Sequence, residues 1–191
     1  MKTIQTIFKN TSIKSIIAIS ILTLGFMSCS NDDDNPEIVN EEEIITTMNV
    51  NLVAGGTTVT LQSQDLDGDG PDAPVITISD NLAANTTYTG TIELLNETET
   101  PAEIITEEVE EESDEHQFLF NFTGSISEIT YSDEDGNGNP VGIMFELTTG
   151  DAGAGTLQIT LRHEPKKPND GTLADAGGET DIAQTFSLFV E

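Results

Sequence analysis

The stretch MNVNLVAGGTTVTLQ, residues 48–62, decides the fold class. Apolar and polar residues alternate along 48–52 and again along 58–62, and a period of two predicts β-strands with one face in the core and one in water. Between the two runs, Gly55-Gly56 predicts a tight hairpin turn, because glycine adopts positive φ values without steric cost. The folded part of the chain therefore starts as an antiparallel hairpin.

Short runs of the same kind continue to the C-terminus. They predict further strands over 75–79, 86–95, 117–122, 129–131, 141–147, 157–162 and 182–190. Short strands separated by turn residues are typical of an all-β sandwich or barrel. We therefore expect an antiparallel β-sandwich of about nine strands over residues 46–191, Ig-like or jelly-roll-like in arrangement.

One segment departs from the period of two. Thr100-Pro101-Ala102-Glu103 has the composition of a capping box with proline at the first helical position. Ile105 and Val109 are four residues apart, the spacing of one helical face. These residues predict one short helix over 101–112, whereas 165–181 is predicted to be a loop. Because a single helix does not alternate with the strands, a doubly wound α/β sheet is not expected.

Residues 1–28 have the features of a secretory signal: three lysines, no acidic residue, and an apolar run over 16–27 followed by Ser28. The apolar run is shorter than the roughly 20 residues of a membrane-spanning helix. Cys29 follows directly and is the only cysteine of the chain, so it has no partner for an internal disulfide. We interpret Cys29 as the lipidation site.

The end of this signal, Phe26-Met27-Ser28-Cys29, resembles a bacterial lipobox. The residues that follow, Ser30-Asn31-Asp32-Asp33-Asp34, resemble the export signal of Bacteroidetes-type surface lipoproteins. The resemblance implies removal of 1–28 and a lipid anchor on Cys29 in the outer membrane, facing outward or, as the alternative, facing the periplasm. Residues 29–45 are polar and acidic and are predicted to form a disordered spacer.

Small lipoproteins of this kind are sometimes labelled "type 1 periplasmic binding fold". That fold consists of two α/β lobes and needs a longer chain. The strand periodicity does not support the label, because strands do not alternate with helices in this sequence.

Acidic residues dominate the charge of the chain. It contains 35 acidic and 6 basic residues, a formal net charge of −29 at pH 7. Such a charge repels nucleic acid and anionic lipid head groups, which excludes a nucleic-acid-binding protein. It attracts cations instead, Ca²⁺ among them.

Two acidic loops have the spacing of the first half of an EF-hand, in which alternate oxygens surround Ca²⁺ and a glycine allows the sharp turn. The predicted ligands are Asp65, Asp67 and Asp69 in the first loop and Asp133, Asp135 and Asn137 in the second. The second half of the motif is missing, because Ile76 and Met144 stand where a bidentate glutamate is needed. Hairpin turns have the same composition without any metal, so both interpretations stay open.

His116 and His163 are the only histidines, and each has a glutamate as its neighbour, Glu115 and Glu164. Imidazole together with carboxylate is a ligand set for transition metals. Neighbours on a strand point to opposite faces, however, so the sequence favours a solvated or hydrogen-bonded histidine over a metal ligand.

Known catalytic motifs do not occur in the sequence, which has neither a Gly-x-Ser-x-Gly elbow nor a phosphate-binding loop. The sequence therefore favours a non-catalytic binding or accessory domain at the cell surface, with Ca²⁺, a partner protein or a glycan as ligand. Two alternatives stay open. One is a hydrolase that uses carboxylates on extracellular glycan, and the other is a structural subunit of an outer-membrane assembly.

Overall fold

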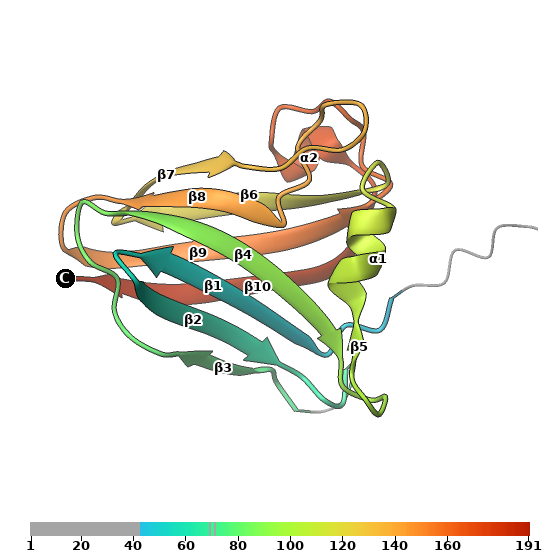
Figure 1. Cartoon of the computed structure of the whole chain (residues 1–191), viewed down its shortest axis with the longest axis horizontal. Helices are drawn as coiled ribbons and strands as arrows, with labels where there is room; N and C mark the ends of the chain where they lie inside the picture. The colour runs from blue at the N-terminus through green and yellow to red at the C-terminus, as the bar shows by residue number, and fades with distance from the viewer. Residues whose placement is uncertain (1–42, 69, 71) are drawn as a thin grey trace, which may run out of the picture. The chain divides into compact units, whose positions relative to one another are not determined.

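Two antiparallel β-sheets lie face to face in the computed structural model, which describes residues 43–191 except 69 and 71 (Figure 1). These residues belong to one unit, Asn40–Glu191. In chain order the described elements are β1 (Thr47–Ala54), β2 (Thr57–Gln64), β3 (Val75–Ile78), β4 (Thr87–Asn96), β5 (Glu103–Ile104), α1 (Ile105–Glu111), β6 (His116–Gly124), β7 (Ile126–Tyr131), β8 (Met144–Thr149), β9 (Gly153–His163), α2 (Leu173–Ala176) and β10 (Glu179–Val190).

The two sheets differ in size, and within each of them all strand pairs are antiparallel. The larger sheet has the order β3-β2-β1-β4-β8-β7, with β5 added at the end of β4, and the smaller has the order β10-β9-β6. In Figure 1 the strands β9 and β10 pass behind β4 and β1. This arrangement confirms the predicted all-β sandwich, and the described residues do not form two α/β lobes.

The opening hairpin forms as its sequence predicts. Gly55 and Gly56 turn the chain with φ values of 57° and 83°, and the register places Leu52 opposite Val59. Alternate residues of both strands are fully buried, while their neighbours reach water. The period of two therefore decides which face of the larger sheet enters the core.

The core fills the space between the two sheets. Its largest fully buried side chains include Met48, Leu52 and Phe145 from the larger sheet and Phe118 and Phe186 from the smaller one. Gly124 lets the chain pass from β6 in one sheet to β7 in the other. Its φ is 69°, and a side chain there would overlap the carbonyl oxygen of Ala154.

The predicted helix exists, but its predicted start was wrong. The helix α1 begins at Ile105, its N-cap is Ile104, and no side chain caps it. Thr100-Pro101 lies before β5, whose two residues pair with Leu95 and Asn96 at the end of β4. The pairing of β5 with β4 therefore replaces the predicted capping box, because it occupies the backbone groups of Glu103 and Ile104 in a strand ladder.

Further boundaries differ from the prediction, among them the starts of β7 at Ile126 rather than 129 and of β9 at Gly153 rather than 157. The strand expected over 141–147 is β8, which begins only at Met144, although Val141 and Ile143 are buried ahead of it. The loop expected over 165–181 contains α2, whose N-cap Thr172 accepts a hydrogen bond from the backbone N–H of Asp175. The last strand begins earlier than expected, at Glu179. Thus ten strands and two short helices are found among residues 43–191, where nine strands and one helix were expected.

The predicted signal (1–28), Cys29, and Ser30, Asn31, Asp32, Asp33 and Asp34 lie outside the described residues. The predicted spacer, 29–45, overlaps them only at its end. There Ile45 packs against the core and the Glu43 side chain is only 7% exposed. None of the described helices is long and apolar enough to cross a membrane.

Candidate metal centre

The two histidines lie side by side at one end of the smaller sheet. His116 is the first residue of β6 and His163 is the last of β9, and the antiparallel register places them directly opposite each other. Both belong to the alternating positions that face the core, so their rings lie on the same side of the sheet, with centroids 4.6 Å apart. The strand pattern itself therefore brings the two imidazoles together.

A β-bulge adds a carboxylate to this pair. The register of β10 against β9 shifts between Thr180 and Ile182, and Asp181 is the residue in between. A bulge re-aims a side chain that regular alternation would place differently. The Asp181 side chain is only 5% exposed and approaches both rings, with 3.9 Å from Oδ1 to His163 Nδ1 and 3.9 Å from Oδ2 to His116 Nε2.

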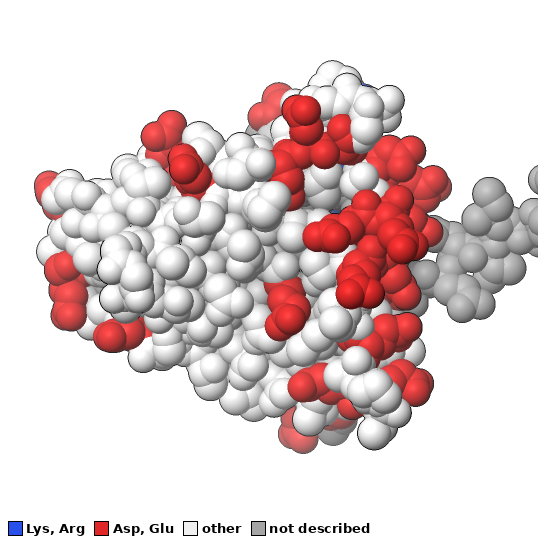
Figure 2. Space-filling model, in the orientation of Figure 1, with Lys and Arg blue, Asp and Glu red and all other residues white. Residues whose placement is uncertain are grey.

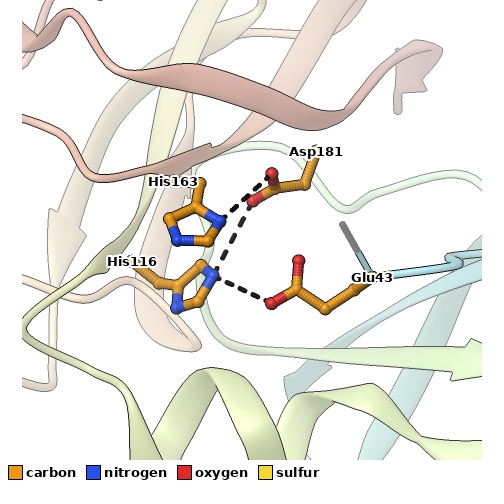
Figure 3. A group of neighbouring side chains, drawn as sticks. All are labelled: Glu43, His116, His163 and Asp181. Carbon is orange, nitrogen blue, oxygen red and sulfur yellow. Dashed lines mark ion pairs between the residues drawn. The ribbon is translucent and has the colours of Figure 1, made fainter. Parts of the chain in front are cut away.

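The fourth member comes from the opposite layer. Glu43 precedes β1 of the larger sheet and reaches across to the smaller sheet, where its Oε1 lies 3.2 Å from His116 Nε2. Figure 3 shows the two carboxylates, Asp181 above and Glu43 below, pointing toward the two tilted imidazoles. We call these four residues, Glu43, His116, His163 and Asp181, the His–carboxylate cluster; one ligand atom from each lies within 4.8 Å of all the others.

A hydrogen bond orients the ring of His116. Its Nδ1 lies 3.3 Å from the backbone oxygen of Glu112, just past the end of α1. A carbonyl oxygen only accepts, so Nδ1 carries the hydrogen and Nε2 is the atom presented to Glu43 and Asp181. A second hydrogen bond of this kind is how proteins fix the tautomer and orientation of a metal-binding histidine.

Three polar atoms of the cluster have no hydrogen-bond partner among the described residues: Glu43 Oε2, His116 Nε2 and Asp181 Oδ2. All three are buried. An orphaned polar atom in the interior is costly, and an unpaired charge costs more. These atoms border the four ligand atoms of the cluster, an arrangement that a small cation could bridge.

Charges within the cluster shift its pKa values. The contact with the His116 ring lowers the pKa of Glu43, whereas burial and the charge of Glu43 raise the pKa of Asp181 to about 6. Burial lowers the pKa of His116, but the contact with Glu43 outweighs it, so that the net shift is upward. The two buried carboxylates therefore repel each other when both are ionised.

A small pocket connects the cluster with the solvent. Its volume is about 100 Å³, and it is lined by Glu43, His163, Asp181, Glu179 and Thr180. Figure 2 shows acidic side chains concentrated around the end of the molecule where α1 lies, while the broad face of the larger sheet has few. An acidic surface of this kind raises the local concentration of cations.

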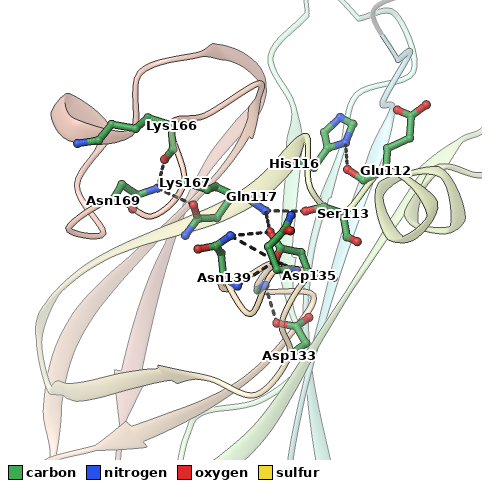
Figure 4. Close-up of polar contacts among 12 residues, drawn as sticks. Glu112, Ser113, His116, Gln117, Asp133, Asp135, Asn139, Lys166, Lys167 and Asn169 are labelled. Carbon is green, nitrogen blue, oxygen red and sulfur yellow. Dashed lines mark hydrogen bonds and ion pairs between the residues drawn. The ribbon is translucent and has the colours of Figure 1, made fainter.

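The second predicted calcium loop uses its carboxylates differently. Asp135 is buried and accepts hydrogen bonds from the backbone N–H groups of Asn137 and Asn139 and from Lys167, whose Nζ is 3.3 Å away (Figure 4). Asp133 accepts from the backbone N–H groups of Gly142 and Met144. These oxygens are engaged by donors of the protein and fasten the loop to its surroundings.

In the first predicted calcium loop, Asp65 is half-buried, Asp67 is exposed, and Asp69 lies outside the described residues. Burial and the neighbouring Asp67 raise the pKa of Asp65. Asp67 accepts a backbone hydrogen bond from Asp72 at 3.5 Å. Calcium binding by either loop stays a prediction.

Sequence reasoning considered the two histidines, but with the wrong carboxylates. Glu115 and Glu164 are exposed and do not belong to the cluster, and its carboxylates, Glu43 and Asp181, do not neighbour either histidine in sequence. One signal was readable: His116 stands two residues before Phe118 and His163 two after Leu161, so both continue the core-facing pattern. The two carboxylates had no comparable signal, since one depends on a bulge and the other on the packing of a segment before β1.

Fold and cluster together define an acidic all-β protein with a buried pair of histidines and a pair of carboxylates. Comparisons with models of protein families, with curated proteins and with solved structures found no match to this chain.

Proposed function

We propose that this protein is a lipid-anchored surface protein whose β-sandwich binds one divalent transition-metal ion of the zinc class in the His–carboxylate cluster. The observation that carries the proposal is the convergence of four ligand atoms around three buried, unpartnered polar atoms. The lipid anchor rests on the resemblance of the segment around Cys29 to a lipobox. The protein would display or retain the metal at the outer membrane.

The donor set favours a transition metal over Ca²⁺. Imidazole nitrogen suits Zn²⁺ and its neighbours, whereas Ca²⁺ takes six to eight oxygens. A tetrahedral Zn²⁺ site with bonds of roughly 2.0–2.2 Å separates its ligand atoms by about 3.4 Å. The distances from His116 Nε2 to Glu43 (3.2 Å) and Asp181 (3.9 Å) are near this value. Two carboxylates also neutralise the two charges of the ion.

Four protein ligands make a closed site. Structural zinc sites use all four positions for side chains, whereas catalytic sites keep one for water or substrate. A binding or stabilising role therefore fits better than catalysis. The carboxylate hydrolase remains the alternative, because Asp181 has a raised pKa beside a second carboxylate. However, the pocket of about 100 Å³ is smaller than the roughly 300–1,000 Å³ typical of pockets for small organic ligands.

The test is a titration of the metal-free full chain with Zn²⁺ at pH 7.5, followed by calorimetry and thermal melting. We expect one ion per chain. At a free concentration of about 100 times Kd, the gain is about 2.7 kcal/mol, or roughly 5–10 °C in Tm for a domain of this size. Co²⁺ in place of Zn²⁺ would give visible absorption bands that report the ligand geometry.

Two variants test whether Zn²⁺ binds in the His–carboxylate cluster or in the acidic loops. His163→Gln removes a ligand and is expected to weaken Zn²⁺ binding at least about tenfold. Asp67→Asn changes an exposed carboxylate outside the cluster and serves as the matched control, with unchanged binding expected. A chain that binds no Zn²⁺, or for which His163→Gln binds as the unchanged chain does, would contradict the proposal.

A further inference from the structure

We infer that the metal ion cross-links the two layers of the sandwich, so that metal availability regulates whether the segment before β1 is fastened to the smaller sheet. The inference rests on the proposed metal binding and adds a consequence of it. Three ligands, His116, His163 and Asp181, belong to β6, β9 and β10. The fourth, Glu43, belongs to the chain that enters the larger sheet.

Few other contacts fasten this segment. No hydrogen bond joins the backbone of residues 43–45 to the rest of the described chain, and Ile44 is 60% exposed. The first firmly bound residue is Thr46, whose backbone N–H donates to the oxygen of Leu95 at 2.9 Å and whose hydroxyl accepts from Glu97. Ile45 packs against the core, but Glu43 and Ile44 precede this contact, so the position of Glu43 depends on its side chain.

Without a metal, the side chain of Glu43 has one polar contact, with His116, and its second oxygen has none. Its charge also repels that of Asp181, which faces the same histidine. Glu179 at the mouth of the pocket and Glu108 on α1, whose pKa burial and the charge of Glu43 help to raise, add negative charge near the cluster. The charge of Arg162 on β9 acts to lower the pKa of Asp181 but is outweighed, and the guanidinium donates its hydrogen bonds to the backbone oxygens of Gly177 and Gly178.

A divalent ion reverses this balance. It attracts both carboxylates and both imidazoles at once, so binding converts a repulsive arrangement into four bonds that span the two layers. The pocket lined by Glu179 and Thr180 leads from the solvent to the cluster, so the ion can exchange with the medium without unfolding of the sandwich. The cross-link is therefore reversible.

Backbone dynamics test the inference. In the full chain labelled with ¹⁵N, the amides of residues 43 and 44 are measured by NMR relaxation without metal and with one equivalent of Zn²⁺. We expect order parameters below about 0.6 without metal and near about 0.85 with it. Amides of β7 and β8, which do not pair with β1, should stay unchanged.

Two variants complete the experiment. Glu43→Gln leaves three ligands, so Zn²⁺ is expected to bind, about 10- to 100-fold more weakly, while residues 43 and 44 stay mobile at saturating metal. Glu146→Gln changes an exposed carboxylate on β8, outside the cluster and its pocket, and should behave as the unchanged chain.

The outcomes are distinguishable. Zn²⁺ binding with no change at residues 43 and 44, or ordering of them in Glu43→Gln, would overturn the cross-link and leave metal binding intact. Absence of Zn²⁺ binding would overturn both. Ordering that depends on Zn²⁺ and on Glu43 supports the inference.

Discussion

Two buried aspartates show how differently this chain treats a carboxylate. Asp135 accepts hydrogen bonds from two backbone N–H groups, from the Asn139 amide and from Lys167. Asp181 faces two imidazoles and leaves Oδ2 without a hydrogen-bond partner. A carboxylate that is fully hydrogen-bonded stabilises a loop, whereas one that is not fits a ligand site. Both aspartates belong to an acid-rich sequence, so their surroundings in the folded structure distinguish their roles.

Asp135 gives a pH prediction. Its hydrogen bonds outweigh burial and lower its pKa to about 2, below the ordinary 3.8. A lowered pKa in the folded state contributes stability above the unfolded value of about 3.8, and this contribution is lost as the pH falls toward about 2. Asp135→Asn should therefore reduce the free energy of unfolding by roughly 1–3 kcal/mol at pH 6, and by clearly less at pH 2.5.

The measurement is urea denaturation of both chains at the two pH values. Glu134→Gln, an exposed neighbour in the same loop, is the control and should show no difference at either pH. An Asp135→Asn deficit of equal size at both pH values would contradict the role assigned to the ionised carboxylate.

At the scale of elements, strand register decides which residues meet. The pairing of β6 with β9 aligns His116 with His163, and one bulged residue in β10 adds Asp181. The alternation of strands was readable from the sequence, since it is a local pattern. The pairing partners were not, because antiparallel neighbours are far apart along the chain. The misplaced helix start has the same cause, since Glu103 and Ile104 pair with β4.

Close packing between β4 and β8 gives a prediction about elements. Gly90 lies opposite Phe145 in the register, and a Cβ atom at Gly90 would overlap the buried Phe145 ring. Gly90→Ala should therefore destabilise the fold by about 1–3 kcal/mol, because a close-packed core absorbs extra volume only through strain. Gly136→Ala is the matched control, because open space surrounds Gly136.

Denaturant midpoints of the two variants provide the test. We expect a clear reduction for Gly90→Ala and a change within about 0.5 kcal/mol for Gly136→Ala. Equal midpoints would show that the Phe145 ring can move aside without loss of packing.

At the scale of the molecule, the acidic side chains lie mostly at one end and few lie on the broad face of the larger sheet. Acidic side chains gather at the end that includes α1, as Figure 2 shows, and six basic residues in the whole chain face 35 acids. Repulsion among them opposes the folded state. The same charge draws cations toward the end of the molecule that contains the His–carboxylate cluster. The acidic surface is thus unfavourable for folding and favourable for the proposed metal site.

Self-repulsion predicts a dependence on salt. Raising NaCl from about 10 mM to about 300 mM shortens the screening length from roughly 30 Å to less than 10 Å. Tm should therefore rise by a few degrees. Melting curves with a chelator present exclude traces of divalent metal, and a Tm that stays constant or falls would contradict repulsion as the dominant effect.

The sequence by itself determined the strand alternation, the opening hairpin and the sandwich class, because each depends on residues close to one another in the chain. The core-facing period also continues through both histidines, which are buried, although the sequence analysis favoured solvated or hydrogen-bonded side chains there. Only the tertiary structure decided which carboxylates accompany them, since Asp181 depends on a bulge and Glu43 on packing across the two sheets. Local patterns specify elements, whereas a site assembled from four separate segments requires their register and contact in space.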